Sequence, residues 1–123
     1  MDAIFSIKPV YAEAIISGQK TFEYRSRVPR QKLDKCYIYA TYPTQRIIGY
    51  FTVKEIMVDD PLEIWNATYR SGGIKAKDFI DYYKDKKSAV AIEIDQVVVF
   101  EKAIQYKEID SVGKPPMSFK YIQ

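Results

Sequence analysis

Histidine is absent from this chain of 123 residues, and cysteine occurs once. The lack of histidine excludes Ser-His-Asp and Cys-His catalysis and zinc sites with histidine ligands. A single cysteine cannot form an internal disulfide, so a cytoplasmic location is expected, and Cys36 is expected to be a small buried apolar residue. The apolar runs are too short to cross a membrane, and the start of the chain lacks the apolar stretch of a signal peptide. We therefore expect no membrane partner.

Flexible linkers are also missing. No tract rich in Pro, Gly or Ser divides the chain, so residues 1–123 are predicted to form a single domain. The net charge is only +3, but the region between positions 20 and 35 has a local excess of positive charge: Lys20, Arg25, Arg27, Arg30, Lys32 and Lys35 against Glu23 and Asp34. With 11 Tyr and 6 Phe in the chain, this excess suits contacts with nucleic-acid bases and phosphates as well as a solvated face over an aromatic core.

The order of apolar patterns and breakers predicts an α+β domain. A helix over 10–17 follows Pro9 and ends at Gly18, and a second helix begins at a cap formed by Asp60-Pro61. A third helix follows the break at 71–73. Strands are predicted over 21–25, 36–41, 46–57 with a bulge at Gly49, and 88–94 and 97–100, the last two being separate or one kinked strand. So many strands in a short chain most easily close into a small β-barrel with flanking helices.

The second and third helices are each predicted to bury one apolar stripe. In the second helix, the stripe consists of Leu62, Trp65 and Tyr69, and Trp65 is expected in the core. In the third helix, the residues expected to face inward are Ala76, Phe79, Ile80 and Tyr83.

The strongest local signal is the stretch from Gly18 to Arg25. Alternation along the predicted strand places Phe22 and Tyr24 on one face and Glu23 and Arg25 on the other. Lys20 precedes the strand and is expected to lie outside the core, aimed at the same cavity. A carboxylate between two cations can orient them and leave donors free for a phosphate or a carbonyl. The alternative is a surface ion pair worth roughly 0–1 kcal/mol.

These residues resemble the signature of the ASCH domain family, which belongs to the PUA-like superfamily. The signature is G-x-K-x-x-E-x-R, and Gly18, Lys20, Glu23 and Arg25 fill it. The similarity extends over nearly the whole chain: residues 5–9 resemble the opening strand and helix start, residues 38–41 and 47–51 the central hairpin, and residues 115–119 the closing segment of small stand-alone members.

The resemblance implies a PUA-like barrel with a cleft beside the signature that binds RNA or a nucleotide base. It makes Lys20, Glu23 and Arg25 the ligand-binding residues. Aromatic residues at 37, 39 and 42 suit base stacking, and Tyr42 is the one we include in the predicted site, although packing in the core or on the barrel surface is the favoured role of any single one of them. Weaker additions are Ser6 and Lys8, which precede a helix N-terminus suited to an anion, and Lys114 and Ser118.

Two enzymatic alternatives stay open. Some small bacterial proteins of this fold are amidohydrolases that act on an acetylated cytidine, using the signature lysine with a threonine and a glutamate. Lys20 matches their lysine, but Glu23 occupies the threonine position and Gly72-Gly73 the glutamate position, and Glu23 is expected to raise the pKa of Lys20. The other alternative is an RNA nuclease. No acidic cluster of metal-site type is evident, so neither a metal nor a cofactor is predicted, and the oligomeric state is left open.

Overall fold

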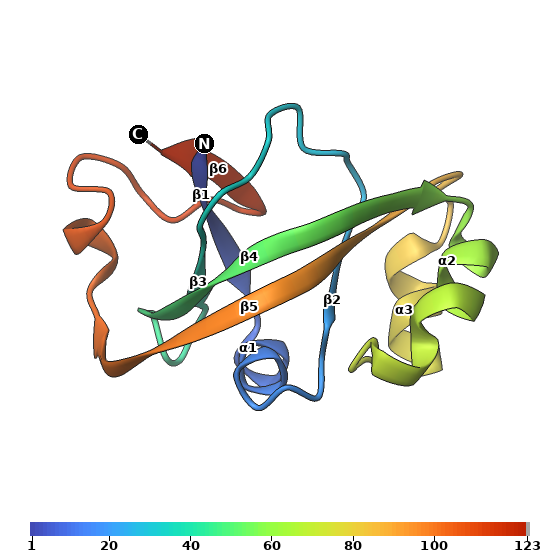
Figure 1. Ribbon diagram of the computed structural model, residues 1–123, viewed down its shortest axis with the longest axis horizontal. Helices are drawn as coiled ribbons and strands as arrows, with labels where there is room; N and C mark the ends of the chain where they lie inside the picture. Colours follow the sequence, from blue (N-terminus) through green and yellow to red (C-terminus); the bar gives the residue numbers. More distant parts are fainter. Residues whose placement is uncertain (123) are drawn as a thin grey trace.

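A computed structural model describes residues 1–122 and contains one six-stranded mixed sheet with helices packed against it (Figure 1). The strands are β1 (Asp2–Ile7), β2 (Phe22–Arg25), β3 (Cys36–Ala40), β4 (Arg46–Asp59), β5 (Ala89–Ile104) and β6 (Phe119–Ile122). The helices are α1 (Pro9–Ile16), α2 (Pro61–Thr68) and α3 (Ala76–Tyr83), with 3-10 turns at η1 (Tyr69–Ser71) and η2 (Tyr106–Glu108).

The sheet has the strand order β2-β5-β4-β3-β1-β6 and curls into a half-barrel (Figure 1). β1 and β3 pair in parallel, and the other neighbouring strands are antiparallel. β2 and β6 are the two edges of the sheet. Side chains join them, because Arg25 in β2 donates hydrogen bonds to the Ser6 carbonyl in β1 and to the Ser118 hydroxyl just before β6. The predicted PUA-like α+β fold is confirmed, with the barrel half closed.

Local signals in the sequence fix several element ends. Gly18 adopts φ 86° directly after α1, a left-handed conformation that favours glycine. The side chain of Asp60 accepts a hydrogen bond from the Glu63 amide at 3.0 Å and so caps α2, as predicted. Gly49 lies at a shift in register between β4 and β5, where a Cβ atom would stand 2.3 Å from the Val98 carbonyl oxygen. The predicted bulge is therefore also a point of close backbone approach.

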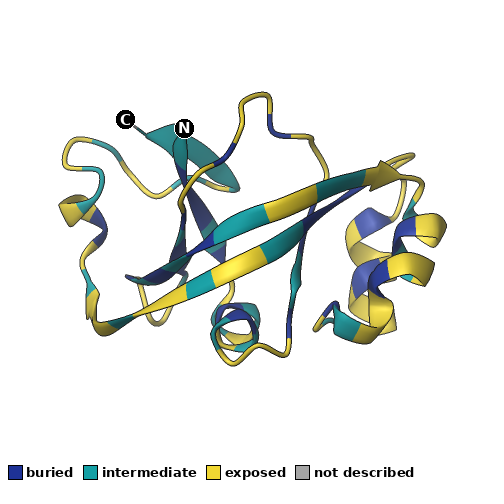
Figure 2. Ribbon diagram, in the orientation of Figure 1, coloured by how far each residue is buried: buried dark blue, intermediate teal, exposed yellow. Residues whose placement is uncertain are grey.

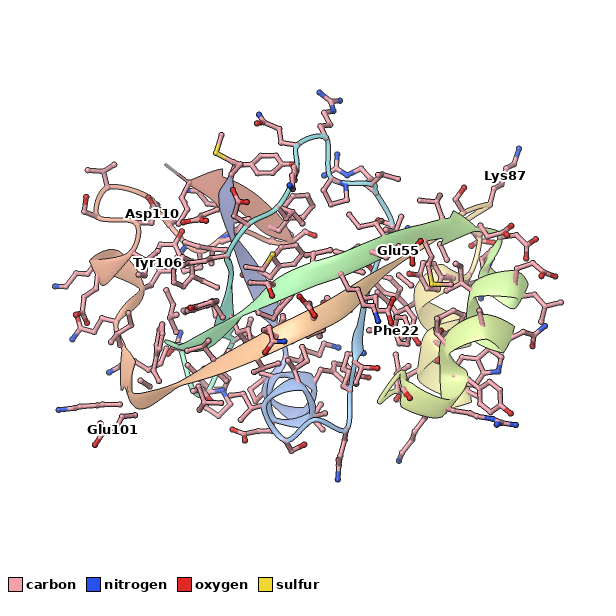
Figure 3. All side chains as sticks on the ribbon, viewed as in Figure 1. Phe22, Glu55, Lys87, Glu101, Tyr106 and Asp110 are labelled. Atoms are coloured by element: carbon pink, nitrogen blue, oxygen red, sulfur yellow. The ribbon has the colours of Figure 1, made fainter. Side chains whose placement is uncertain are left out.

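The core has one part under the centre of the sheet, another under α2 and α3, and a third that packs β1, β3 and β4 against η2 (Figure 2). In the first part, α1 packs against the sheet, and Phe5 contacts Phe51 and Phe119 with ring centroids 5.7 and 4.9 Å apart. Cys36 is fully buried there, as predicted, and burial raises the pKa of its thiol to about 12. In the second part, α2 and α3 cover the end of the long β4–β5 ribbon, whose two ends are marked by Lys87 and Glu101 in Figure 3.

The predicted helix stripes are partly wrong. In α2 the buried residues are Ile64 and Thr68, whereas Leu62 and Tyr69 are exposed. Trp65 is half-buried and packs against Phe79, with centroids 5.0 Å apart. In α3 only Phe79 and Tyr83 are buried, whereas Ala76 and Ile80 are exposed. Each helix covers only the end of a narrow ribbon, so a single i, i+4 row is buried instead of a broad stripe.

Of the two alternatives for 88–94 and 97–100, the single strand is confirmed: residues 89–94 and 97–100 both belong to β5, which has irregular register opposite β4. Among the helices described, none is long and apolar enough to cross a membrane.

Candidate functional site

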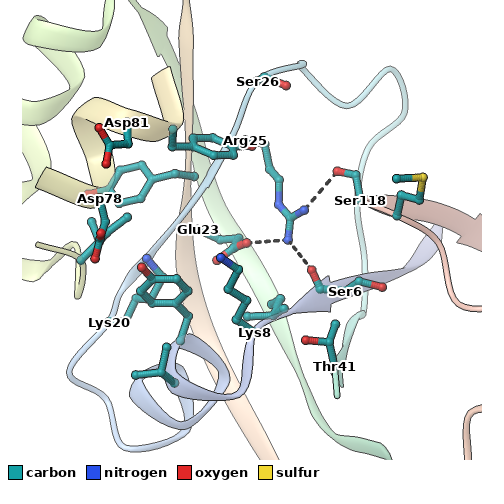
Figure 4. A pocket seen from close by; sticks show the side chains of 17 residues that line it. Ser6, Lys8, Lys20, Glu23, Arg25, Ser26, Thr41, Asp78, Asp81 and Ser118 are labelled. Carbon is teal, nitrogen blue, oxygen red and sulfur yellow. Dashed lines mark hydrogen bonds and ion pairs between the residues drawn. The ribbon is translucent and has the colours of Figure 1, made fainter. Parts of the chain in front are cut away.

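A pocket of about 870 Å³ lies along β2, where the sheet is open between its two edges (Figure 4). Its walls come from the end of β1 and the start of α1, from the stretch Lys20–Ser26, from α3, and from the segment just before β6. The signature residues Lys20, Glu23 and Arg25 all line it. Segments far apart in the sequence therefore meet at the signature.

Lys20 is buried in the wall of this pocket, with 3% of its surface exposed. Its ammonium group donates a hydrogen bond to the Gly72 carbonyl at 2.6 Å and lies over the rings of Tyr24 and Tyr11, at 4.6 and 5.3 Å from their centroids. Burial lowers the pKa of Lys20, and Arg25 lowers it further, while Glu23 opposes the change. The prediction that Lys20 lies outside the core is wrong, and so is the expected upward pKa shift, because loss of hydration outweighs the attraction of Glu23.

Glu23 and Arg25 form a buried ion pair with an N–O distance of 2.6 Å. The guanidinium also donates to the Ser6 carbonyl at 3.1 Å and to the Ser118 hydroxyl at 3.0 Å, as the dashed lines in Figure 4 show. Its Nε is buried and has no hydrogen-bond partner among the residues that the structure describes. The carboxylate therefore orients Arg25 alone, since the ammonium of Lys20 is held by Gly72.

Both faces of β2 are buried, which differs from the exposed polar face implied by a surface ion pair. Tyr24 is 7% exposed and packs edge-on against Phe79 in the core under α3. Its hydroxyl donates to Thr68, whose own hydroxyl donates to the Ile64 carbonyl. The polar face is covered because Arg25 bonds to Ser6 and Ser118 across the gap between the two edges of the sheet, which we call the seam of the half-barrel. The sequence pattern of a single strand does not reveal these contacts.

The glycine pair at 72–73 packs directly on the signature. A Cβ atom on Gly72 would lie 2.1 Å from the Tyr24 hydroxyl, and one on Gly73 would lie 2.6 Å from the Lys20 Cβ. Gly73 also has φ 62°, which disfavours other residues. These positions leave no space for a glutamate side chain, so the carboxylate of the amidohydrolase arrangement has no equivalent at the place where we align it.

Ser6 and Lys8 also line the pocket, so the structure brings five of the six predicted site residues together. The Ser6 hydroxyl donates to the Pro116 carbonyl at 2.7 Å, and this bond helps to fix the segment before β6. Lys8 is exposed and precedes the first residue of α1. Ser118 lines the pocket as well, whereas Lys114 does not.

Tyr42, the sixth predicted residue, is 79% exposed and is not part of the pocket wall. The other two tyrosines considered for stacking are used in packing. Tyr39 is buried against Tyr106, with centroids 5.4 Å apart, and Tyr37 packs on Tyr50 at 5.7 Å. Packing is therefore the observed role of both Tyr37 and Tyr39.

Sequence reasoning missed the wall formed by Tyr11 and by α3. Asp78, Asp81 and Tyr82 lie on one side of α3 and line the pocket. In Figure 4, Asp78 and Asp81 lie across the pocket from Ser6 and Ser118. Their i, i+3, i+4 spacing is the signal that could have revealed a second functional face of this helix. Burial raises the pKa of Tyr11, and Asp78 and Glu23 raise it further. Residues 1–122 contain no group of three or more His, Cys, Asp or Glu side chains suited to hold a metal ion.

The half-barrel with its flanking helices is a PUA-like α+β fold, and comparison with known proteins agrees. The family model described as the ASCH domain matches residues 5–105, so the chain belongs to the ASCH domain family. It is 30% identical over 125 residues to a protein from Zymomonas mobilis named "ASCH domain-containing ribonuclease", covering 99% of this chain and 84% of that one.

The crystal structure of the ASCH protein from Zymomonas mobilis superposes with a TM-score of 0.91 and 29% identity, covering 99% of this chain and 87% of that one. The chain is also 25% identical over 122 residues to a Ureaplasma parvum protein named ATP synthase subunit alpha. That match covers 98% of this chain but only 15% of the Ureaplasma protein.

Proposed function

We propose that this chain binds single-stranded RNA in the pocket along β2 and cleaves the RNA backbone there. The observation on which the proposal rests is the buried ammonium of Lys20, whose pKa is lowered by loss of hydration. A lysine with a lowered pKa can accept a proton at a pH at which an ordinary surface lysine cannot. The name of the Zymomonas relative supports RNA as the substrate.

The pocket residues provide the groups for cleavage by the 2′ hydroxyl of the RNA itself. In this reaction the neutral amine of Lys20 takes the proton of the 2′ hydroxyl, and the 2′ oxygen forms a bond to phosphorus. The bond from phosphorus to the 5′ oxygen breaks, and the leaving oxygen takes the proton of the Tyr11 hydroxyl, whose raised pKa keeps it protonated. The products are a 2′,3′-cyclic phosphate and a 5′ hydroxyl, and exchange with water restores both side chains.

Arg25 and Lys8 supply positive charge for the phosphate. Three of the five N–H groups of Arg25 are bonded to Ser6, Glu23 and Ser118. The two that remain are the buried Nε N–H and one Nη1 N–H, and the latter is the donor proposed for a phosphate oxygen. Because Glu23 and the two serines fix the guanidinium, it does not need to reorganise when charge develops on the phosphate. Lys8, exposed at the pocket, adds a second cation.

The test uses a labelled RNA strand and the same strand with 2′-deoxy sugars. We expect the wild-type protein to cleave only the RNA and to leave a cyclic phosphate. Lys20→Arg keeps the positive charge but not the proton acceptor, so it should bind RNA and cleave it at least about 100-fold more slowly. Lys102→Arg, at an exposed position outside the pocket, is the matched control and should leave the rate unchanged.

Equal cleavage of the deoxy strand, or cleavage by Lys20→Arg at the wild-type rate, would contradict the proposal. Release of acetate from acetylated cytidine by the wild-type protein would favour the amidohydrolase alternative instead. The rate of RNA cleavage should also rise with pH, because Lys20 must lose its proton, and the rise should be centred below the ordinary lysine value of 10.5.

A further inference from the structure

The residues directly after the signature strand form an exposed segment with unpaired positive charge. This basic segment comprises residues 26–32 and starts at the pocket, because Ser26 lines the pocket wall. Arg27, Arg30 and Lys32 are exposed. None of the three ion pairs found within residues 1–122 involves them, and the nearby Asp34 is paired with the N-terminal ammonium group.

The backbone of the basic segment is fixed at several points although it has no regular secondary structure. Pro29 is buried within the segment, and Leu33, directly after it, belongs to the main core. The Gln31 amide donates to the Tyr121 hydroxyl at 3.0 Å, and the N-terminal ammonium group donates to the Lys32 carbonyl at 3.1 Å. The cations therefore extend from an ordered backbone, so binding an anion requires little ordering of the chain.

The wall of the pocket formed by α3 carries negative charge. Asp78 and Asp81 lie on the α3 side of the pocket, whereas Ser26, where the basic segment begins, lies on another side, as Figure 4 shows. A phosphate chain passing along the side of α3 that lines the pocket would meet Asp78 and Asp81, since the lysines in and beside α3 do not line the pocket. One passing over the basic segment would meet three cations. The two sides of the pocket are thus electrostatically unequal for a polyanion.

We propose that an RNA strand bound in the pocket continues across the basic segment, where Arg27, Arg30 and Lys32 bind its phosphates. The substrate is then a single-stranded oligonucleotide of several nucleotides, and not a mononucleotide or a free nucleoside. This inference rests on the proposed function for the identity of the anion and goes beyond it in the length and path of the strand. Each phosphate neutralised on a single strand contributes about 0.7 to the slope of log affinity against log salt concentration.

The test compares a long with a short ligand in the triple variant Arg27→Gln, Arg30→Gln, Lys32→Gln. The long ligand is a 2′-O-methyl RNA of about 12 nucleotides, which cannot be cleaved through its 2′ oxygen, and its binding is followed by fluorescence anisotropy between roughly 50 and 200 mM salt. The short ligand is an RNA dinucleotide, whose single phosphate is held in the pocket and whose cleavage is followed directly.

We expect the triple variant to bind the long strand about 100-fold more weakly near 0.1 M salt, with a salt slope smaller by about 2. Cleavage of the dinucleotide should keep its wild-type kcat/KM. The matched control is the triple variant Lys54→Gln, Lys102→Gln, Lys107→Gln, which removes the same charge at exposed positions outside the pocket wall and should bind like wild type.

Three results would overturn this path. The first is wild-type affinity and salt slope in the triple variant, and the second is an equal loss of affinity in the control variant. The third is a parallel loss of dinucleotide cleavage in the triple variant, which would mean that the basic segment shapes the pocket. The binding measurement does not depend on cleavage. A wild-type protein that cleaves no RNA, but whose affinity for the long strand depends on the basic segment, would therefore contradict the proposed function and leave the path intact.

Discussion

Two ion pairs of almost equal length lie in very different surroundings in this protein. Glu23 and Arg25 approach to 2.6 Å at the seam of the half-barrel, and their side chains are only 7% and 9% exposed. Asp110 and Lys120 approach to 2.7 Å between the segment after η2 and β6, with Lys120 35% exposed. In Figure 3, Asp110 lies beside Tyr106 at the end of the molecule away from α2 and α3. Judged by distance alone, the two pairs would contribute equally to the stability of the fold.

Burial separates the two pairs. Moving both charges of Glu23 and Arg25 out of water is costly, and the extra acceptors Ser6 and Ser118 compensate for that cost. A buried pair of this kind holds the two side chains in one geometry but adds little net stability. Lys120 stays hydrated, so little is lost or gained when its pair with Asp110 breaks. The comparison predicts which substitutions the fold tolerates.

The largest effect is expected for Glu23→Gln. This change leaves the buried guanidinium of Arg25 without a counter-charge and should lower the free energy of unfolding by about 3–5 kcal/mol. Urea denaturation measures the change. The double variant Glu23→Gln, Arg25→Met removes both charges and should recover much of the lost stability, although it should not bind RNA. A loss below about 1 kcal/mol for Glu23→Gln would place this pair in the same class as the exposed one.

An intermediate effect is expected for Lys20→Met, and it should depend on pH. The substitution removes a buried charge but also the hydrogen bond to the Gly72 carbonyl, so the net change should stay within about 1.5 kcal/mol near neutral pH. Because the folded-state pKa of Lys20 lies below 10.5, the unfolded chain binds more protons in the interval between the two values. The wild type should therefore gain stability relative to Lys20→Met as the pH rises through that interval. Denaturation at several pH values tests this, and a relative loss would have the wrong sign.

The smallest effect is expected for Asp110→Asn, at about 1 kcal/mol or less. Hydrogen bonds from Lys120 and then from Tyr106 lower the pKa of Asp110. A lowered carboxyl pKa adds stability above the unfolded-state value of 3.8, and this contribution is lost as the pH falls through the folded-state value. The difference between wild type and Asp110→Asn should thus be constant near neutrality and vanish in acid. A difference that grows on acidification would contradict the assigned hydrogen bonds.

The sequence predicts features that depend on neighbouring residues and misses those that depend on distant ones. The helix ends at Gly18 and Asp60 and the alternation along β2 follow from local rules, and all three are present. The burial of Lys20 depends on the glycine pair 72–73, which lies more than 50 residues further along the chain: the Gly72 carbonyl accepts its hydrogen bond, and Gly73 packs on it without a side chain. The exposure of Ile80 has the same kind of cause, since it depends on how little of the β4–β5 ribbon is left for α3 to cover.

The seam contact of Arg25 also sets the moment at which the site is complete during synthesis. The match to the family model ends at residue 105, but the guanidinium needs the hydroxyl of Ser118, and the hydroxyl of Ser6 needs the carbonyl of Pro116. A ribosome that has released residues 1–105 has made all of β1 to β5 and none of these acceptors. The nascent chain therefore carries the whole signature while its arginine is bonded to Glu23 and Ser6 but not yet to Ser118, and the pocket takes its final form only when residues 116–118 emerge.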